Sequence, residues 1–353
     1  MTLPSKYESM SDEQLVAAIE RAKESLGDAL VILVHHYQRD EVIQFADFRG
    51  DSLGLSRRAA AAESAKYIVF CGVYFMAETA AILCKPDQLV IQPVEEALCP
   101  MAQMANADDV AQAWDALSTV WDTDMIPITY QNSTAAVKSF VGQHGGAVCT
   151  SSNAPNLFDW AFQRKGHILF MPDEHLGTNT ALAMGIPREE IGIWDPAHPP
   201  DPKTLAHCRV VVWKGYCYVH TGFTVGHVDA AYQSHPDAIV AVHPECRHEI
   251  VARSDIAGST MGIIRADEEA PVGATIAVGT EYHLVNRLDW QHPGKTVVSL
   301  SPRVCETMAM THMKDLLYVL DSVLAGTPCH IVTVEKETAK GARVALERML
   351  EAS

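Results

Sequence analysis

The sequence predicts an α/β protein built from parallel sheets, and two observations lead to this prediction. From residue 29 onward, short apolar runs rich in Val and Ile alternate with helical patterns. Strands that are apolar throughout are typical of parallel sheets covered on both faces by helices. Three long stretches also repeat one plan: a strand with a polar end, a small-polar loop, and further strands that end near a cysteine. A repeat of whole multi-strand blocks favours three α/β/α domains over a single (β/α)₈ barrel, which would explain only the alternation.

The repeats set the expected limits of the domains. The three α/β/α domains are expected over residues 28–123, 124–235 and 236–325. A helix within residues 1–27 precedes them, because Ser11 can act as its N-cap and Gln14, three residues later, can complete a capping box. A C-terminal helix within residues 326–353 is expected to pack back on the body. The middle repeat is the longest, since it contains the Pro-rich insert WDPAHPPDPKT.

Composition and charge exclude several classes of function. The chain has 353 residues, of which 48% are hydrophobic and 20% charged, as in ordinary globular proteins. Its net charge of −17 argues against extended nucleic-acid binding, which depends on clustered Lys and Arg. No apolar run approaches the roughly 18 residues that cross a bilayer, and the N-terminus lacks the pattern of a secretion signal. We therefore expect a cytoplasmic protein without membrane or nucleic-acid partners.

Polar side chains stand at matched positions where the first strand of each repeat ends. These strand ends are His35-His36-Tyr37, Tyr130-Gln131-Asn132 and His243-Pro244-Glu245. Ligands of open parallel sheets bind beyond the carboxyl ends of the strands, so we interpret these positions as a binding or catalytic site. The loops that follow are Asp51-Ser52, Thr150-Ser151-Ser152-Asn153 and Gly258-Ser259-Thr260. Such residues cap helix N-termini, and a helix N-terminus can also bind a phosphate or a carboxylate.

The cysteines predict thiols or a metal site. Nine cysteines, an odd number in a chain expected to be cytoplasmic, argue against a disulfide framework, and no C-x-x-C pair occurs. Cys71 and Cys149 lie in or beside apolar runs and are expected to be core residues. The three repeats end near Cys99, Cys217 and Cys305.

An ordered set of motifs resembles one known family over nearly the whole chain. In order these motifs are HHYQ…GDSL, CGVYFMAETA, YQNSTAAVKS, TSSNA, WKGYCYVH, HPEC…DIAGST and VGTE. Together they resemble the quinolinate synthase family of bacterial NAD biosynthesis. The resemblance implies three pseudo-threefold-related α/β/α domains around a central [4Fe–4S] cluster, one per chain. It also implies a cytoplasmic transferase that condenses iminoaspartate with dihydroxyacetone phosphate, releasing phosphate and two waters to give quinolinate. A transient contact with L-aspartate oxidase is a further expectation.

The resemblance also assigns the site residues. The implied cluster ligands are Cys99, Cys217 and Cys305, which would leave one iron without a cysteine. Tyr37 and Glu245 are expected to transfer protons, while His35, His243 and Tyr130 orient and polarise the substrates. The residues expected to bind substrate are His35, Ser52, Tyr130, Asn132, Ser151, His243, Glu245 and Thr260.

The chain departs from the family's pattern at two places. Leu98 stands where the family usually has Gly before its first cluster cysteine, and this can change the local backbone. After Cys305 the sequence reads ETMAMTHMKD and lacks the extra cysteines of some members. A redox disulfide near the cluster is therefore not expected.

Two functions of other classes fit the same residues. The first is another enzyme, either an iron–sulfur dehydratase or an aldolase that holds zinc on His35 and His243. The second is an iron–sulfur sensor or carrier, which would not need the polar strand ends. Metal analysis separates zinc from a four-iron cluster.

Overall fold

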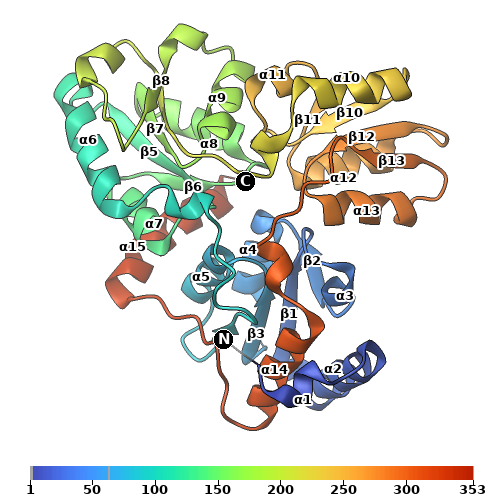
Figure 1. Cartoon of the computed structure of the whole chain (residues 1–353). Coiled ribbons are helices and arrows are strands. Elements are labelled where there is room, and N and C mark those ends of the chain that lie inside the picture. The colour runs from blue at the N-terminus through green and yellow to red at the C-terminus, as the bar shows by residue number, and fades with distance from the viewer. Residues whose placement is uncertain (1–2, 63, 353) are drawn as a thin grey trace. The chain divides into compact units, whose positions relative to one another are not determined.

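The computed structural model describes residues 3–62 and 64–352 and contains three parallel sheets flanked by helices (Figure 1). This architecture confirms the predicted fold class. The chain forms two compact units, of which the first comprises Met1–Cys99 and Val304–Val334 and the second Pro100–Arg303 and Glu335–Ser353. The domain limits expected from the sequence stay a prediction. Within the described ranges, none of the helices has the length and apolarity needed to cross a membrane.

The first unit holds a four-stranded parallel sheet. Its strands, in spatial order, are β2 (Phe48–Gly50), β1 (Leu30–His35), β3 (Tyr67–Cys71) and β4 (Leu89–Ile91). Its helices are α1 (Ser5–Glu8), α2 (Asp12–Leu26), α3 (Asp40–Ile43), α4 (Ser52–Ala61), α5 (Tyr74–Leu83) and α14 (Met313–Leu324). One buried core contains Leu316 and Leu320 of α14 and Ile19 of α2. It also contains Leu30, Ile32 and Val34 of β1.

The N-terminal helix begins with the predicted capping box. Ser11 Oγ accepts a hydrogen bond from the Gln14 N–H at 3.4 Å, and the Ser11 N–H donates to Gln14 Oε1 at 2.9 Å. The helix ends at Gly27, whose φ of 49° lies in the left-handed region that glycine enters without strain. Both signals were readable from the sequence.

The second unit holds the other two sheets. The five-stranded sheet has the order β6 (Ala147–Cys149), β5 (Met125–Tyr130), β7 (His167–Met171), β9 (Val210–Trp213), β8 (Ile191–Trp194). Its helices are α6 (Ala107–Trp121), α7 (Ala135–Gln143), α8 (Ala154–Phe162) and α9 (Glu174–Ala183). The four-stranded sheet has the order β11 (Ile256–Ala257), β10 (Ile239–Val242), β12 (Thr275–Gly279), β13 (Thr296–Ser299). Its helices are α10 (Val225–Ser234), α11 (His248–Val251), α12 (Thr260–Glu269) and α13 (Tyr282–Gln291).

The three sheets share one strand order, which confirms the repeated plan. In each sheet the first strand lies between the second and the third, and a fourth strand follows the third. The five-stranded sheet adds only β8, which pairs with β9 at the edge and precedes the Pro-rich insert. The longer middle repeat thus encodes one additional edge strand and its connection.

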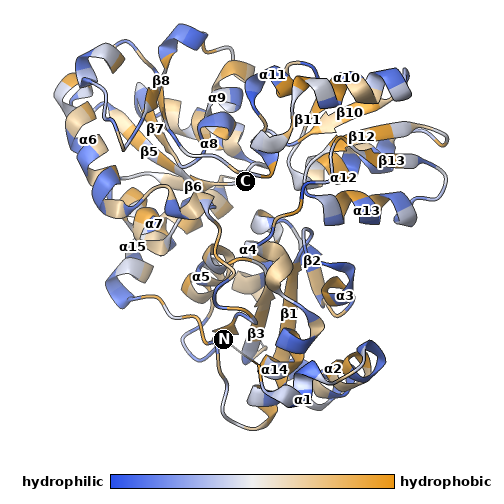
Figure 2. Cartoon of the chain, viewed as in Figure 1, coloured by the Kyte–Doolittle hydropathy of each residue, from blue (hydrophilic) through white to orange (hydrophobic). Residues whose placement is uncertain are grey.

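The strands are apolar because both faces of each sheet are covered. All six residues of β1 and all six of β5 are buried. Figure 2 shows the strands mainly in the colours of hydrophobic residues, while the helices carry both hydrophobic and hydrophilic residues. The polar residues predicted for the site therefore stand at the strand ends and in the segments that follow them.

Two glycines allow a close contact between the C-terminal helix α15 (Lys336–Glu351) and α7. A Cβ atom at Gly142 would meet the carbonyl oxygen of Gly341 far inside contact distance. The guanidinium of Arg348 adds hydrogen bonds to the carbonyls of Gly142 at 3.3 Å and Gly146 at 2.6 Å. The backbones of the two helices thus approach as closely as glycine permits.

We expect Gly142→Ala to lower the free energy of unfolding by about 1–3 kcal/mol, the usual cost of inserting a methyl group into a packed contact. Chemical denaturation measures this change. Gly226→Ala is the matched control, since the nearest atom to its added Cβ is Thr224 Oγ1 at 3.7 Å, and alanine is the better helix former. Equal stability of the two variants would show that α15 does not need the close contact.

Candidate active site

The carboxylate of Glu245 is the centre of a buried polar cluster in the second unit. Glu245 follows β10, and its side chain is almost fully buried. The hydroxyl of Tyr130, at the end of β5, donates to Glu245 Oε1 at 2.5 Å. Two of the three predicted strand ends, one from each sheet of this unit, are therefore in direct contact.

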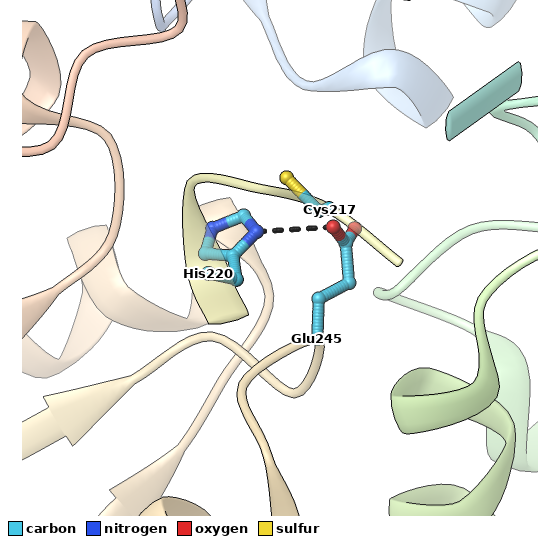
Figure 3. Close-up of side chains that lie close together, drawn as sticks. All are labelled: Cys217, His220 and Glu245. Carbon is cyan, nitrogen blue, oxygen red and sulfur yellow. Dashed lines mark hydrogen bonds and ion pairs between the residues drawn. The ribbon is translucent and has the colours of Figure 1, made fainter. Parts of the chain in front are cut away.

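His220 completes the cluster and was not predicted. Its Nδ1 lies 3.0 Å from Glu245 Oε2 (Figure 3). Its Nε2 lies 3.1 Å from Thr280 Oγ1. A carboxylate only accepts hydrogen bonds, so Nδ1 carries the proton that it donates to Glu245. The motif WKGYCYVH contains His220 and could have indicated it. The prediction compared only the ends of the first strands of the repeats, and His220 follows a later strand.

His243, two residues before Glu245 in the turn after β10, is a neutral histidine. Its Nδ1 accepts the backbone N–H of Glu245 at 3.3 Å, so its proton lies on Nε2, which donates to Ser151 Oγ at 3.2 Å. Burial, with a smaller effect of the neighbouring His220, lowers the pKa of His243 to about 3. Its ring stacks on that of His220 with centroids 4.3 Å apart. The 3.7 Å approach of Nδ1 to Glu245 Oε1 is therefore not an ion pair.

Glu245 remains ionised although it is buried. Burial by itself would raise the pKa of its carboxyl, but the electrostatic effect of the histidines and the hydrogen bonds from His220 and Tyr130 outweigh it and lower the pKa. Because His243 is neutral, we attribute the lowering to His220 and Tyr130. The cluster therefore holds a carboxylate, the form that a general base requires.

A second buried carboxyl, Asp173, has the opposite character. Burial first, and then the charge of Glu245, raise the pKa of Asp173 well above its ordinary value. Its Oδ1 accepts the Leu176 N–H at 2.5 Å and caps α9, and its φ of 87° lies in the left-handed region, which a non-glycine residue enters only at a cost. The surroundings thus favour ionisation of the Glu245 carboxyl and oppose that of Asp173, and such opposite shifts are typical of acid–base sites. The sequence analysis did not single out Asp173.

The other predicted residues of the second unit lie in the polar segments that follow the strands. The amide oxygen of Asn132 is buried and has no hydrogen-bond partner within residues 3–62 and 64–352, so it can accept from a ligand. Ser151 contacts His243, as described above, while Thr260 is buried at the first position of α12. The Oγ atoms of Ser152 and Ser259 lie 3.0 Å apart, which brings the two polar loops of this unit together.

The loop residues expected to cap helices do so in two of three cases. Asp51 Oδ1 accepts the Gly54 N–H at 2.8 Å, and Ser259 Oγ accepts the Gly262 N–H at 3.2 Å. Asn153 occupies the N-cap position of α8, but its Oδ1 accepts the Thr150 N–H at 2.7 Å instead. It therefore shapes the loop that carries Ser151.

In the first unit, the strand end of β1 repeats the geometry of the strand end of β10. His35 Nδ1 accepts the backbone N–H of Tyr37 at 3.1 Å, as His243 accepts that of Glu245. The rings of His35 and Tyr37 meet edge to face with centroids 4.7 Å apart. Ser52 follows the cap residue Asp51 as the first residue of α4. The shared use of Nδ1 leaves Nε2 of each histidine for another partner.

One group of side chains could hold a metal ion. The ligand atoms of Cys217, His220 and Glu245 all lie within 4.8 Å of one another (Figure 3). Cys217 and His220 come from the segment after β9, and Glu245 comes from the turn after β10. Thiolate, imidazole and carboxylate together suit a transition metal better than Mg²⁺ or Ca²⁺. Cys217 belongs both to this group and to the three cysteines predicted as cluster ligands.

Burial divides the thiols into two classes. Burial raises the pKa of Cys71 to about 12 and also raises the pKa of Cys149 and Cys246. These thiols stay protonated, whereas a metal ligand must be a thiolate. The predicted ligands Cys99, Cys217 and Cys305 are each only partly buried. The donor set therefore fits a thiolate-bound metal group.

Comparisons with known proteins agree with these features. A family model described as "Quinolinate synthetase A protein" matches residues 17–351. The chain is 47% identical over 357 aligned residues to a protein named quinolinate synthase from Anoxybacillus flavithermus, with 99% of this chain and 96% of the relative covered. It is 46% identical to proteins of the same name from Bacillus cereus and Bacillus anthracis, with the same coverage.

The neutral state of His243 predicts how stability depends on pH. Its pKa is about 3 in the folded chain and about 6.5 when unfolded, so below pH 6.5 the unfolded state binds a proton that the folded state does not. Stability should fall with decreasing pH, by up to about 1.4 kcal/mol per unit for this residue. Denaturation between pH 7 and 5 should show a shallower loss for His243→Gln. The exposed His198 is the control, since His198→Gln should keep the wild-type slope.

Proposed function

The chain belongs to the quinolinate synthetase A protein family, and from this premise we propose that it condenses iminoaspartate with dihydroxyacetone phosphate to quinolinate. The reaction releases phosphate and two waters and makes the protein a transferase of de novo NAD biosynthesis. The observation that carries the proposal is the buried, ionised Glu245, held by Tyr130 and His220 beside neutral His243. Such a set can remove and return protons, which enolisation, condensation and dehydration each require.

The proposal includes a [4Fe–4S] cluster as cofactor. Cys99, Cys217 and Cys305 would hold it, and their partial burial sets them apart from the protonated core thiols. When bound, the cluster would supply an iron without a cysteine ligand that acts as a Lewis acid. The arrangement of Cys217, His220 and Glu245 supports a metal group on the second unit.

The residues of the chain divide between proton transfer and binding. We assign proton transfer to Glu245 and Tyr37, and orientation and polarisation to His35, His243 and Tyr130. The Nε2–H of a neutral histidine can donate to a carbonyl or carboxylate without adding a full charge. The residues assigned to hold phosphate and carboxylates are Ser52, Asn132, Ser151 and Thr260.

The hydrogen bonds of Glu245 suggest how it could act as a base. Tyr130 and His220 stabilise the carboxylate, which makes it available near neutral pH but weak as a base. Substrate groups that displace either donor would strengthen it at the moment of proton transfer. The reaction would then start from the ionised form and need no prior deprotonation.

The proposal extends to the setting of the enzyme. It includes a cytoplasmic location and a transient contact with L-aspartate oxidase, because an imine hydrolyses in water and benefits from direct delivery. Neither the charge of −17 nor the composition favours a nucleic-acid partner.

The cluster assignment is tested by replacing each cysteine with Ser and recording visible absorbance, iron and sulfide under anaerobic conditions. Cys99→Ser, Cys217→Ser and Cys305→Ser should each lose the broad iron–sulfur absorbance, because each removes a ligand. The controls Cys71→Ser and Cys149→Ser should keep it, since these thiols are protonated and buried. A requirement for Cys84 or Cys246 would refute the assignment, and one zinc per chain would favour a zinc enzyme.

The role of Glu245 is tested by Glu245→Gln. Tyr130 can reverse its hydroxyl to accept from the new amide, so the shape of the site should survive while the basic oxygen is lost. We expect turnover to fall by about 10²–10⁴ with little change in substrate binding. Quinolinate formation from both substrates is measured anaerobically with a full cluster. Tyr37→Phe should also slow turnover, whereas near-normal turnover of Glu245→Gln would mean that Glu245 only binds substrate.

A further inference from the structure

One buried side chain, that of Asn179, binds the turn that contains Glu245. It comes from a helix that covers the five-stranded sheet. Asn179 lies in α9 and is 6% exposed. Its Nδ2 donates to the carbonyl of Pro244 at 2.8 Å and to that of Cys246 at 2.8 Å. These two residues flank Glu245 in the chain, so one amide group binds the backbone on both sides of the carboxylate's residue.

The two carbonyl acceptors set the orientation of this amide, and a third hydrogen bond agrees with it. Oδ1 of Asn179 lies 2.9 Å from Nδ1 of His248, which can donate to it. A flipped amide would point its oxygen at two carbonyl oxygens and lose both of these hydrogen bonds. The side chain can therefore serve this turn in only one orientation.

The helix that presents Asn179 is itself held firmly. Gly177 lies so close to Phe170 of β7 and Val212 of β9 that a Cβ atom would clash with both side chains. The first turn of the helix is capped by Asp173. Asn179 thus links a helix packed on the five-stranded sheet to the turn after β10.

The strand end of β5 has a matching arrangement. Lys138 in α7 is fully buried, and its Nζ donates to the carbonyl of Gln131 at 2.8 Å and to that of Ser133. These residues flank Asn132 as Pro244 and Cys246 flank Glu245. The same contact pattern at two strand ends, made by different residue types, indicates a requirement of the strand ends and not of general packing.

We propose that Asn179 is a positioning residue that acts through Glu245 by fixing the turn Pro244–Cys246. The inference rests on the proposed function of Glu245 as a base. A displacement of about 1 Å at a reacting group can cost about 10²-fold in rate. Within the turn, the Cys246 N–H donates to the His243 carbonyl at 2.9 Å. Asn179 adds a second restraint by binding the carbonyls of Pro244 and Cys246.

The test is Asn179→Asp, which keeps the shape but replaces the NH₂ group by an oxygen that faces two carbonyl oxygens. We expect kcat to fall at least 10-fold with a smaller change in KM and with normal iron, sulfide and visible absorbance. His248→Ala is the control, because it removes only the exposed partner of Oδ1 and should keep kcat within about twofold. Asn179→Ala, which removes the donors without adding repulsion, should show the same direction of change and serves if the Asp variant does not fold.

A double-mutant cycle separates positioning from general destabilisation. In the Glu245→Gln background, Asn179→Asp should have less than a threefold further effect on kcat, because the group that it positions is already inactive. Fully additive effects, or wild-type kcat in both Asn179 variants, would overturn the inference while leaving the role of Glu245 intact. Normal turnover of Glu245→Gln alone would overturn both, and the single variant reveals this case.

Discussion

The carboxylate of Glu245 is buried at the carboxyl end of β10, where an unpaired negative charge would cost several kcal/mol. Its two oxygens are instead paired with donors from different elements, Tyr130 at the end of β5 and His220 after β9. Both donors come from the five-stranded sheet, while Glu245 comes from the four-stranded one. These two hydrogen bonds therefore join segments of the two sheets of the second unit around one charge.

Burial around this charge shifts the pKa values of two neighbouring groups. Burial, and then the charge of Glu245, raise the pKa of Asp173 well above its ordinary value. His243 is neutral because it is buried and uses Nδ1 to accept a backbone N–H, which leaves no room for a second proton there. The Glu245 carboxylate is held by two hydrogen-bond donors, so it is preorganised to exchange a proton with a substrate.

Sequence patterns predicted the sheets and the strand ends because those features are local. Alternation of apolar runs and helical patterns indicated parallel strands, and the matched ends of β1, β5 and β10 located Tyr130, His243 and Glu245. His220 escaped the prediction because it follows the last strand of a repeat, whereas the alignment of polar ends used only first strands. Lys138 and Asn179 escaped it for another reason. A polar residue on a helix normally faces solvent, and only the tertiary structure shows that these two are buried against backbone carbonyls.

The nine thiols show how solvation can select ligands where spacing alone does not. Cys71, Cys149, Cys208 and Cys246 are buried, and burial raises the pKa of each, so they are poor sources of thiolate. The five partly buried cysteines are Cys84, Cys99, Cys217, Cys305 and Cys329. Cys84 ends a helix and donates to the Ala81 carbonyl, and Cys329 does not follow the last strand of a repeat. Thiol burial therefore narrows the candidates to five, and position in the repeats narrows these to the three predicted ligands, which follow β4, β9 and β13.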